Sequence, residues 1–220
     1  LPTHGANVYI GQAVESMMNM KTESMQLHDL DVTQPIWERC FTVHPLVVIG
    51  TVEEDGSIDL APKHLAMPMS WHNFFGFICT PRHSTYQNIK RDKQFTVTYV
   101  RPSQTVLTSL SASPRCEDGS KPIIQALPTF SADKVNGAFL EDGYLFLECE
   151  LDRIIDDLDQ NSVIIGRLVA AKVAVDTLRS SDQDDQALVK ASPLLAYLYP
   201  GRFAEISASN KLPFPAGFER

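Results

Sequence analysis

The stretch LVVIGTVEEDGSIDLAPKHLAMPMSWHNFFGFICTPRHSTYQNIKRDKQFTVT, Leu46–Thr98, decides the fold of this chain. Two of its apolar runs, VVIGTV and FFGFICT, have the length and the β-branched or aromatic content of strands. Asp55 and Gly56 follow the first run and are typical of a hairpin turn. Pro62 has no backbone N–H, so Ala61–His64 cannot be an ordinary central strand.

A polar cluster follows the second apolar run, where a helix is expected to start at Ser84 or Thr85. The cluster comprises Thr80, Arg82, His83, Ser84 and Thr85. Free amides at a helix N-terminus attract anions, and a guanidinium offers a planar fork of donors to phosphate oxygens. The pattern can therefore hold a phosphate; the alternative is a helix cap with an exposed arginine. Thr80 is the weakest candidate, because threonine is common in strands.

Hydrophobic alternation and turn residues predict a chain made mainly of strands. We expect strands at about 39–43, 46–53, 74–80, 94–100, 144–151, 162–175 and 203–206. Helices are expected over Ser84–Asp92 and Ser103–Ser111, each with a hydroxyl available for capping. A methionine-rich segment predicts an N-terminal helix over residues 11–27, and the acidic segment 180–187 predicts a surface loop or disordered tip.

The order of these elements resembles the flavin reductase-like family of FMN-binding split β-barrels. The residues that carry the resemblance are Asp55, Gly56, Ala61, Pro62, Ser84, Thr85, Asn88, Ile89, Phe95 and Val97. Leu145–Val173, with its Glu-Cys pair and its strand ending in Ile-Gly, and Pro193–Ile206, with Gly201-Arg202-Phe203, are also similar to the family. The resemblance covers about residues 35–206.

The resemblance implies a mainly β fold: an antiparallel, Greek-key, FMN-binding split β-barrel with flanking short helices. A single domain over residues 1–220 is expected, with its core at about 35–206. Ser113–Gly143 is rich in proline, glycine, serine and aspartate and is too long for a passive hairpin loop. We expect this segment to fold over the barrel mouth.

The resemblance also implies FMN as the cofactor and assigns candidate residues to its parts. Arg82, His83, Ser84 and Thr85, with Thr80, are expected at the phosphate. Extended backbone at Ala61, Pro62, Lys63 and His64 is expected along the pyrimidine edge, with Pro62 holding it free of the sheet ladder and Lys63 adding positive charge near N1 and O2. Asn88 faces either the cofactor or a helix-to-barrel contact. Arg202 reaches a phosphate or a substrate carboxylate, or forms a salt bridge at the barrel end.

The implied activity is an oxidoreductase in which NAD(P)H reduces the flavin, and no catalytic side chain is assigned. One departure from the family bears on this activity: many members carry histidine where this chain has Asn161. A flavoprotein oxygenase or oxidase acting on a small organic substrate, and a non-catalytic FMN-binding protein, are therefore alternatives. A homodimer is expected from the resemblance and from the methionine-rich segment.

Composition restricts the partners and the compartment. The net charge of −8 argues against nucleic acid, whose phosphates require a basic surface. No apolar run is long enough for a membrane span, and the first residues lack a signal-peptide pattern. The four cysteines have neither metal-site nor redox spacing, and Cys79 and Cys149 are expected to be buried thiols. A reducing, cytoplasmic compartment without a bound metal is the resulting expectation.

Overall fold

The computed structural model describes residues 26–180, 183–214 and 217. It divides the chain into two compact units, residues 1–36 and 37–220. Residues 26–36, the described part of the first unit, contain turns but no helix or strand. The helix predicted over residues 11–27 lies almost entirely outside the described residues, and the single domain over residues 1–220 stays a prediction.

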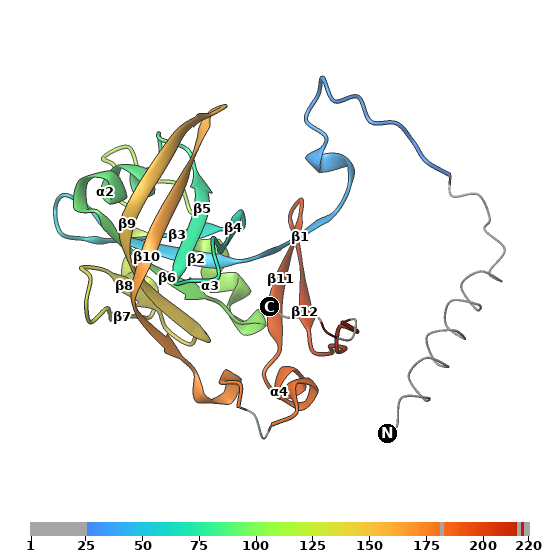
Figure 1. Ribbon diagram of the computed structural model, residues 1–220. Helices are drawn as coiled ribbons and strands as arrows, with labels where there is room; N and C mark the ends of the chain where they lie inside the picture. Colours follow the sequence, from blue (N-terminus) through green and yellow to red (C-terminus); the bar gives the residue numbers. More distant parts are fainter. Residues whose placement is uncertain (1–25, 181–182, 215–216, 218–220) are drawn as a thin grey trace, which may run out of the picture. The chain divides into compact units, whose positions relative to one another are not determined.

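A seven-stranded antiparallel sheet forms the main part of the second unit (Figure 1). Its strands, in spatial order, are β3 (Ile58–Lys63), β2 (Val47–Val52), β6 (Gln94–Tyr99), β9 (Leu145–Leu158), β10 (Asn161–Val173), β5 (Phe74–Cys79) and β4 (Ala66–Pro68). Every residue of β2 is buried, because this strand lies between β3 and β6 in the sheet and contributes to two apolar clusters. The antiparallel, mainly β prediction is confirmed.

A second sheet of three strands consists of β1 (Thr42–Pro45), β11 (Leu194–Tyr199) and β12 (Arg202–Ile206). Only Leu46 separates β1 from β2, so a nearly continuous line of chain runs from the small sheet into the large one. The barrel is therefore split: the two sheets share a chain segment without closing into one ladder. The sequence analysis predicted β12 but did not predict β11, where leucine, alanine and tyrosine give no clear alternation.

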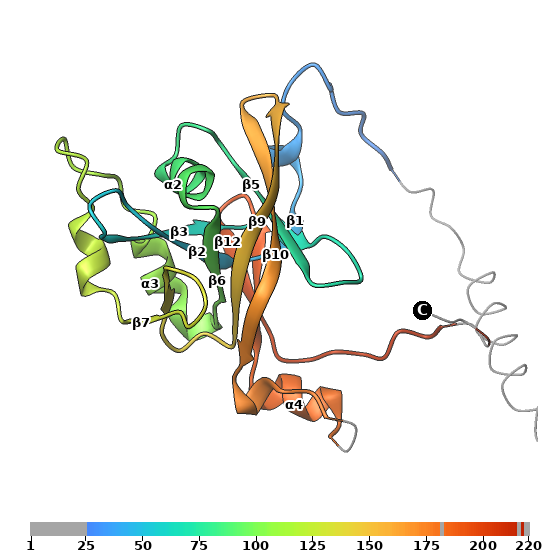
Figure 2. The same cartoon turned by 60° about the vertical axis from the view of Figure 1, so that its left-hand side comes forward.

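Short helices flank the sheets, as Figures 1 and 2 show. They are η1 (Trp37–Arg39), α2 (Ser84–Asp92), η2 (Pro102–Gln104), α3 (Thr105–Leu110), η3 (Pro122–Ala126), η4 (Val175–Thr177) and α4 (Asp185–Ala191). The prediction of α2 is confirmed over its full length. The loop predicted over residues 180–187 is corrected, because the Asp184 side chain accepts a hydrogen bond from the Gln186 amide and begins α4.

Aromatic side chains of β5 and β6 fill the larger of the two cores. The rings of Phe77 and Phe95 pack edge to face, with their centroids 5.5 Å apart, and both side chains are buried. Cys79 and Cys149 belong to the same core, which confirms their prediction as buried thiols. Burial raises the pKa of both thiols, so they remain protonated at neutral pH.

The segment Ser113–Gly143 is folded and is fixed to the large sheet by threonine and glutamate side chains. It contains η3 and a hairpin of β7 (Thr129–Ser131) and β8 (Ala138–Leu140). The hydroxyl of Thr96 on β6 donates to the Ala138 carbonyl at 2.6 Å. Glu148 on β9 is 1% exposed, and its carboxylate accepts hydrogen bonds from three consecutive amides, those of residues 133–135.

Replacing Glu148 with glutamine should destabilise the protein, because one carboxylate oxygen becomes an NH2 group that faces backbone donors. We expect Glu148→Gln to lower the free energy of unfolding by about 2 kcal/mol. Glu150→Gln, at an exposed position of the same strand, is the matched control and should change stability by less than about 0.5 kcal/mol. Urea denaturation measures both; equal values for the two variants would contradict this role of Glu148.

Candidate functional site

The N-terminus of α2 presents free backbone donors at one end of the large sheet. His83 is the N-cap, and no side chain caps the helix. The amides of Tyr86 and Gln87 both donate to the His83 carbonyl, so those of Ser84 and Thr85 are the ones left without an acceptor within the helix. The helix therefore begins at Ser84, as expected, and leaves two adjacent amides for an anion.

A cavity of about 360 Å³ lies against this helix end and is called the anion cavity below. Seven of the sequence-predicted site residues line it: Ala61, Pro62, Lys63, Arg82, His83, Ser84 and Thr85. They come from two separate segments, the end of β3 and the turn into α2. The fold therefore brings the predicted pyrimidine-edge segment and the predicted phosphate segment into one cavity.

The lining is strongly positive. The cationic side chains are Lys63, Arg82, Arg115 and Lys121, with His83 able to add a fifth charge, and Asp59 is the acidic residue of the lining. Arg115 and Lys121 belong to the segment that follows α3, and the sequence analysis did not select them. Both lie in the Ser113–Gly143 segment, which was expected to fold over the barrel mouth, but neither residue belongs to a motif.

Asp59, which also lines the cavity, forms ion pairs with both Arg115 and Lys121. Its side chain is 4% exposed and lies 3.3 Å from Lys121 Nζ and 3.1 Å from Arg115 Nη2. Lys121 Nζ also donates to the Leu60 carbonyl at 2.8 Å, and Arg115 forms an ion pair with Glu53. Asp59 and Glu53 together balance Arg115 and Lys121, so the positive charge available to a ligand comes from Lys63 and Arg82.

Strand β3 is an edge strand and leaves backbone groups open toward the cavity. It pairs with β2, where Pro62 is opposite Val48. The Leu60 carbonyl points away from β2, since it accepts from Lys121, and residues two apart in a strand point the same way. The Pro62 carbonyl therefore also points outward. The prediction that Pro62 holds this segment free of the ladder is corrected: the segment is paired on one side and open on the other.

Burial and neighbouring cations change the protonation of the cavity's bases. Burial lowers the pKa of His83, and the charges of Lys63 and Arg82 lower it further. Burial also lowers the pKa of Lys121, although Asp59 opposes this change. An anion that enters the cavity would reverse the repulsion among these groups, so the imidazolium of His83 and the bound anion should stabilise each other.

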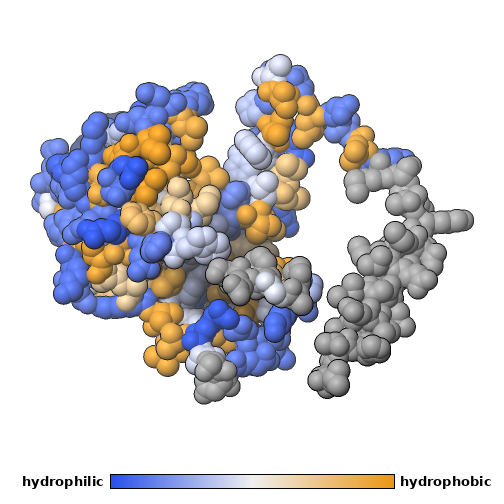
Figure 3. Space-filling view, in the orientation of Figure 1, coloured by the Kyte–Doolittle hydropathy of each residue, from blue (hydrophilic) through white to orange (hydrophobic). Residues whose placement is uncertain are grey.

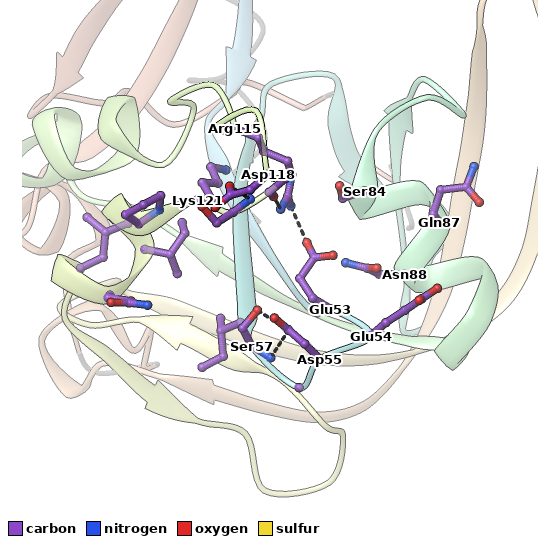
Figure 4. A pocket seen from close by; sticks show the side chains of 18 of the residues that line it. Glu53, Glu54, Asp55, Ser57, Ser84, Gln87, Asn88, Arg115, Asp118 and Lys121 are labelled. Atoms are coloured by element: carbon purple, nitrogen blue, oxygen red, sulfur yellow. Dashed lines mark hydrogen bonds and ion pairs between the residues drawn. The ribbon is translucent and has the colours of Figure 1, made fainter.

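A larger cavity of about 1000 Å³ adjoins the anion cavity and shares Arg82, Ser84, Arg115 and Lys121 with it. Figure 4 shows Ser84, Gln87 and Asn88 of α2 on one side of it and Arg115, Asp118 and Lys121 on another, with Glu53 between them. Asn88 is buried, and its amide donates to Thr51 Oγ1 at 3.1 Å. This bond is the helix-to-barrel contact, one of the two roles considered for Asn88.

The remaining candidates lie elsewhere. His64 turns away from its neighbour Lys63 and lines a third cavity with Tyr199. The Thr80 hydroxyl is buried without a hydrogen-bond partner in the described chain, but Thr80 does not line the anion cavity. Arg202 begins β12 and lines none of these three cavities. Asn161 begins β10, next to Gln160, whose side chain accepts a 3.1 Å hydrogen bond from Arg82.

The anion cavity has the donors that FMN requires. Amides, hydroxyls and Arg82 suit a phosphate, and open carbonyl groups of β3 suit the polar edge of a flavin ring. The residues present therefore fit this cofactor.

Comparison with known proteins agrees with this geometry. The profile of the family described as "Flavin reductase like domain" matches residues 39–206. The chain belongs to this family. The prediction made from Leu46–Thr98 and its continuation is thereby confirmed.

Solved structures with the same fold belong to proteins of different function. A 2-nitrobenzoate 2-nitroreductase from Pseudomonas fluorescens superposes with a TM-score of 0.72 at 18% identity, covering 88% of this chain and 99% of its own. Nitrilotriacetate monooxygenase component B from Bacillus cereus gives 0.73 at 15%, covering 86% and 100%. An FMN-binding protein from Thermus thermophilus gives 0.68 at 17%, covering 86% and 100%. At these identities the similarity shows the fold.

Anion binding should raise the pKa of His83, which burial holds below its ordinary value of 6.5. Because sulfate stabilises the charged imidazole, sulfate affinity should increase as the pH falls through the pKa of His83. NMR titration of the histidine ring signals with and without sulfate measures this. His72, on an exposed loop, is the control whose signals should not move with sulfate. An unchanged His83 titration would contradict the assignment of the cavity to anions.

Proposed function

We propose that this chain is an FMN-dependent oxidoreductase whose flavin accepts hydride from NAD(P)H. The observation that carries the proposal is the anion cavity, where the α2 N-terminus and four cationic side chains meet the open edge of β3. A flavin mononucleotide combines a dianionic phosphate with a flat polar ring, and this cavity offers a partner for each. The family membership supports a flavoprotein oxidoreductase in general terms.

The chain's own residues have positioning and electrostatic roles. The amides of Ser84 and Thr85 and the guanidinium of Arg82 would bind the phosphate, and backbone of Ala61–His64 would orient the ring. The flavin, when bound, supplies the redox chemistry. Lys63 would stabilise negative charge on the reduced ring, because its ammonium is close enough to lower the pKa of both His64 and His83.

FMN should bind at least tenfold more tightly than riboflavin, because a charge-assisted phosphate site contributes about 1.5–3 kcal/mol. Arg82→Ala should remove most of this preference while leaving riboflavin affinity unchanged. Arg167→Ala is the matched control, since Arg167 is also exposed and pairs with a surface carboxylate, Glu150. Fluorescence titration with both flavins measures the effect. Equal affinities of the wild type for FMN and riboflavin would contradict the phosphate site, and loss of secondary structure in Arg82→Ala would make that arginine structural.

Asn161 favours a second candidate function, in which the flavin is not reduced by a nicotinamide. Its family counterpart is often histidine, which can carry positive charge and transfer a proton near neutral pH, whereas an amide cannot. An oxidase or oxygenase of a small organic substrate, or a non-catalytic FMN carrier, then remains. The neighbouring Gln160 contacts Arg82, so this turn lies beside the proposed phosphate site.

Anaerobic mixing with NADH or NADPH separates these candidates. We expect slow flavin bleaching in the wild type and faster bleaching in Asn161→His, because the imidazole can add a charge near the dinucleotide. Asn73→His, on the loop before β5, serves as a control substitution. Stopped-flow absorbance at the flavin bands gives the rates. Fast wild-type bleaching that is indifferent to position 161 would contradict the role of this residue and favour a plain flavin reductase.

We also propose a homodimer in a reducing, cytoplasmic compartment. Large apolar side chains are exposed on β1, β4 and the following loop, including Val43, Met67 and Trp71, at 68%, 58% and 92% exposure. Figure 3 shows apolar and hydrophilic surface side by side on one face of the molecule. The described cysteines are free thiols, and no described helix has the length and apolar character to cross a bilayer. A monomeric mass by light scattering with FMN present would contradict the dimer.

A further inference from the structure

A third cavity, of about 420 Å³, lies beside the end of β3 and is called the aromatic cavity. It is lined by Trp37, Thr42, His44, His64, Leu65 and Tyr199. Its size lies in the range of small-molecule sites. His64 follows directly after Lys63, which lines the anion cavity, so the backbone expected to hold the flavin ring leads from one cavity into the other.

The rings of the aromatic cavity hold one another in place. The His64 ring stacks on Tyr199 at 5.5 Å with an interplanar angle of 22°, and it lies 4.7 Å from the Tyr197 ring. His44 meets His64 edge-on at 5.6 Å, and its Nε2 is 2.7 Å from Thr42 Oγ1. Because these rings already contact one another, they lose little side-chain freedom when a ligand binds. Such a surface of rings favours a flat, aromatic ligand.

The polar groups of this cavity favour a negatively charged ligand. None of its six lining residues is acidic, while two are imidazoles and Lys63 is adjacent. Burial lowers the pKa of His64, and the charges of His44 and Lys63 lower it further. A carboxylate beside His64 would oppose this lowering, because it would stabilise the charged imidazole.

We infer that the aromatic cavity binds a flat aromatic carboxylate, the second substrate of the flavin site. The identification as a substrate rests on the proposed function, whereas the binding itself rests on the rings and imidazoles described above. His64 and His44 would bind the carboxylate, and Trp37 and Tyr199 would contact the ring. The exposed apolar rim formed by Trp37 and Leu65 would be covered by the ligand rather than by protein.

Benzoate is the probe, and Trp37 is the reporter. The chain has two tryptophans, so Trp71→Phe leaves Trp37 as the single indole. We expect saturable quenching by benzoate, with at least tenfold weaker binding of cyclohexanecarboxylate, which lacks the flat ring, and of benzyl alcohol, which lacks the charge. The titrations are made with FMN-free and FMN-loaded protein, so a failure of FMN binding is distinguished from a failure of benzoate binding.

His64→Ala in the same background should weaken benzoate at least tenfold, and His72→Ala, on the exposed loop, should change it less than twofold. Circular dichroism checks the fold, and His44→Ala replaces His64→Ala if that variant does not fold.

Equal binding of the three ligands, or no quenching with or without FMN, would overturn the inference. Displacement of benzoate by riboflavin would assign the cavity to the flavin ring. Trp37 fluorescence that follows protein concentration instead of benzoate would assign it to a second copy of the chain. Either result would also overturn the inference.

Discussion

The open outer edge of β3 is the constraint on which the rest of the site depends. Pro62 has no N–H to offer a further strand, so the large sheet ends at β3. At that edge Lys121 donates to the Leu60 carbonyl, and the Pro62 carbonyl also points outward. Helix α2 packs against β2 and β3, which places its free amides beside the same edge. Donors for a phosphate and an open edge for a flat ring thus come together because the sheet stops there.

The charge of the anion cavity is held in place by a carboxylate that is itself nearly inaccessible. Burying the charge of Asp59 or of Lys121 alone would cost free energy, but their ion pair offsets the loss of hydration. Arg115 shares Asp59 and also pairs with Glu53, which ties the segment after α3 to the β2–β3 hairpin. The cavity is therefore prepared for an anion before one binds, and little reorganisation is required on binding.

The sequence predicted the fold and the central part of the site for identifiable reasons. The Asp55-Gly56 turn and the α2 segment are local signals, and both were found where they were expected. The pairing of β3 along one side and the strand β11 were not predicted, because they depend on partners distant in sequence. Arg115 and Lys121 were missed for the same reason: a lone cation in a loop gives no signal until the fold places it beside Asp59.

Two residues expected at the flavin site, His64 and Arg202, do not line the anion cavity. His64 was grouped with Ala61–Lys63 from its position in the sequence, yet the chain bends after Lys63 and its ring joins Tyr197 and Tyr199 of β11. Arg202 lies on the small sheet and away from the lining of the anion cavity. Both differences arise because the small sheet packs its tyrosines against the end of β3, an arrangement that no local pattern in the sequence indicates.

The central claim is that the α2 N-terminus binds the phosphate of FMN, and the backbone amides of Ser84 and Thr85 report on it directly. Their ¹H–¹⁵N NMR signals should be compared during titration with FMN and with riboflavin, which differ by the phosphate alone. We expect large downfield shifts of both amides with FMN, because they form new hydrogen bonds to an anion, and small shifts with riboflavin. Equal shifts with the two flavins, or none with FMN, would contradict it.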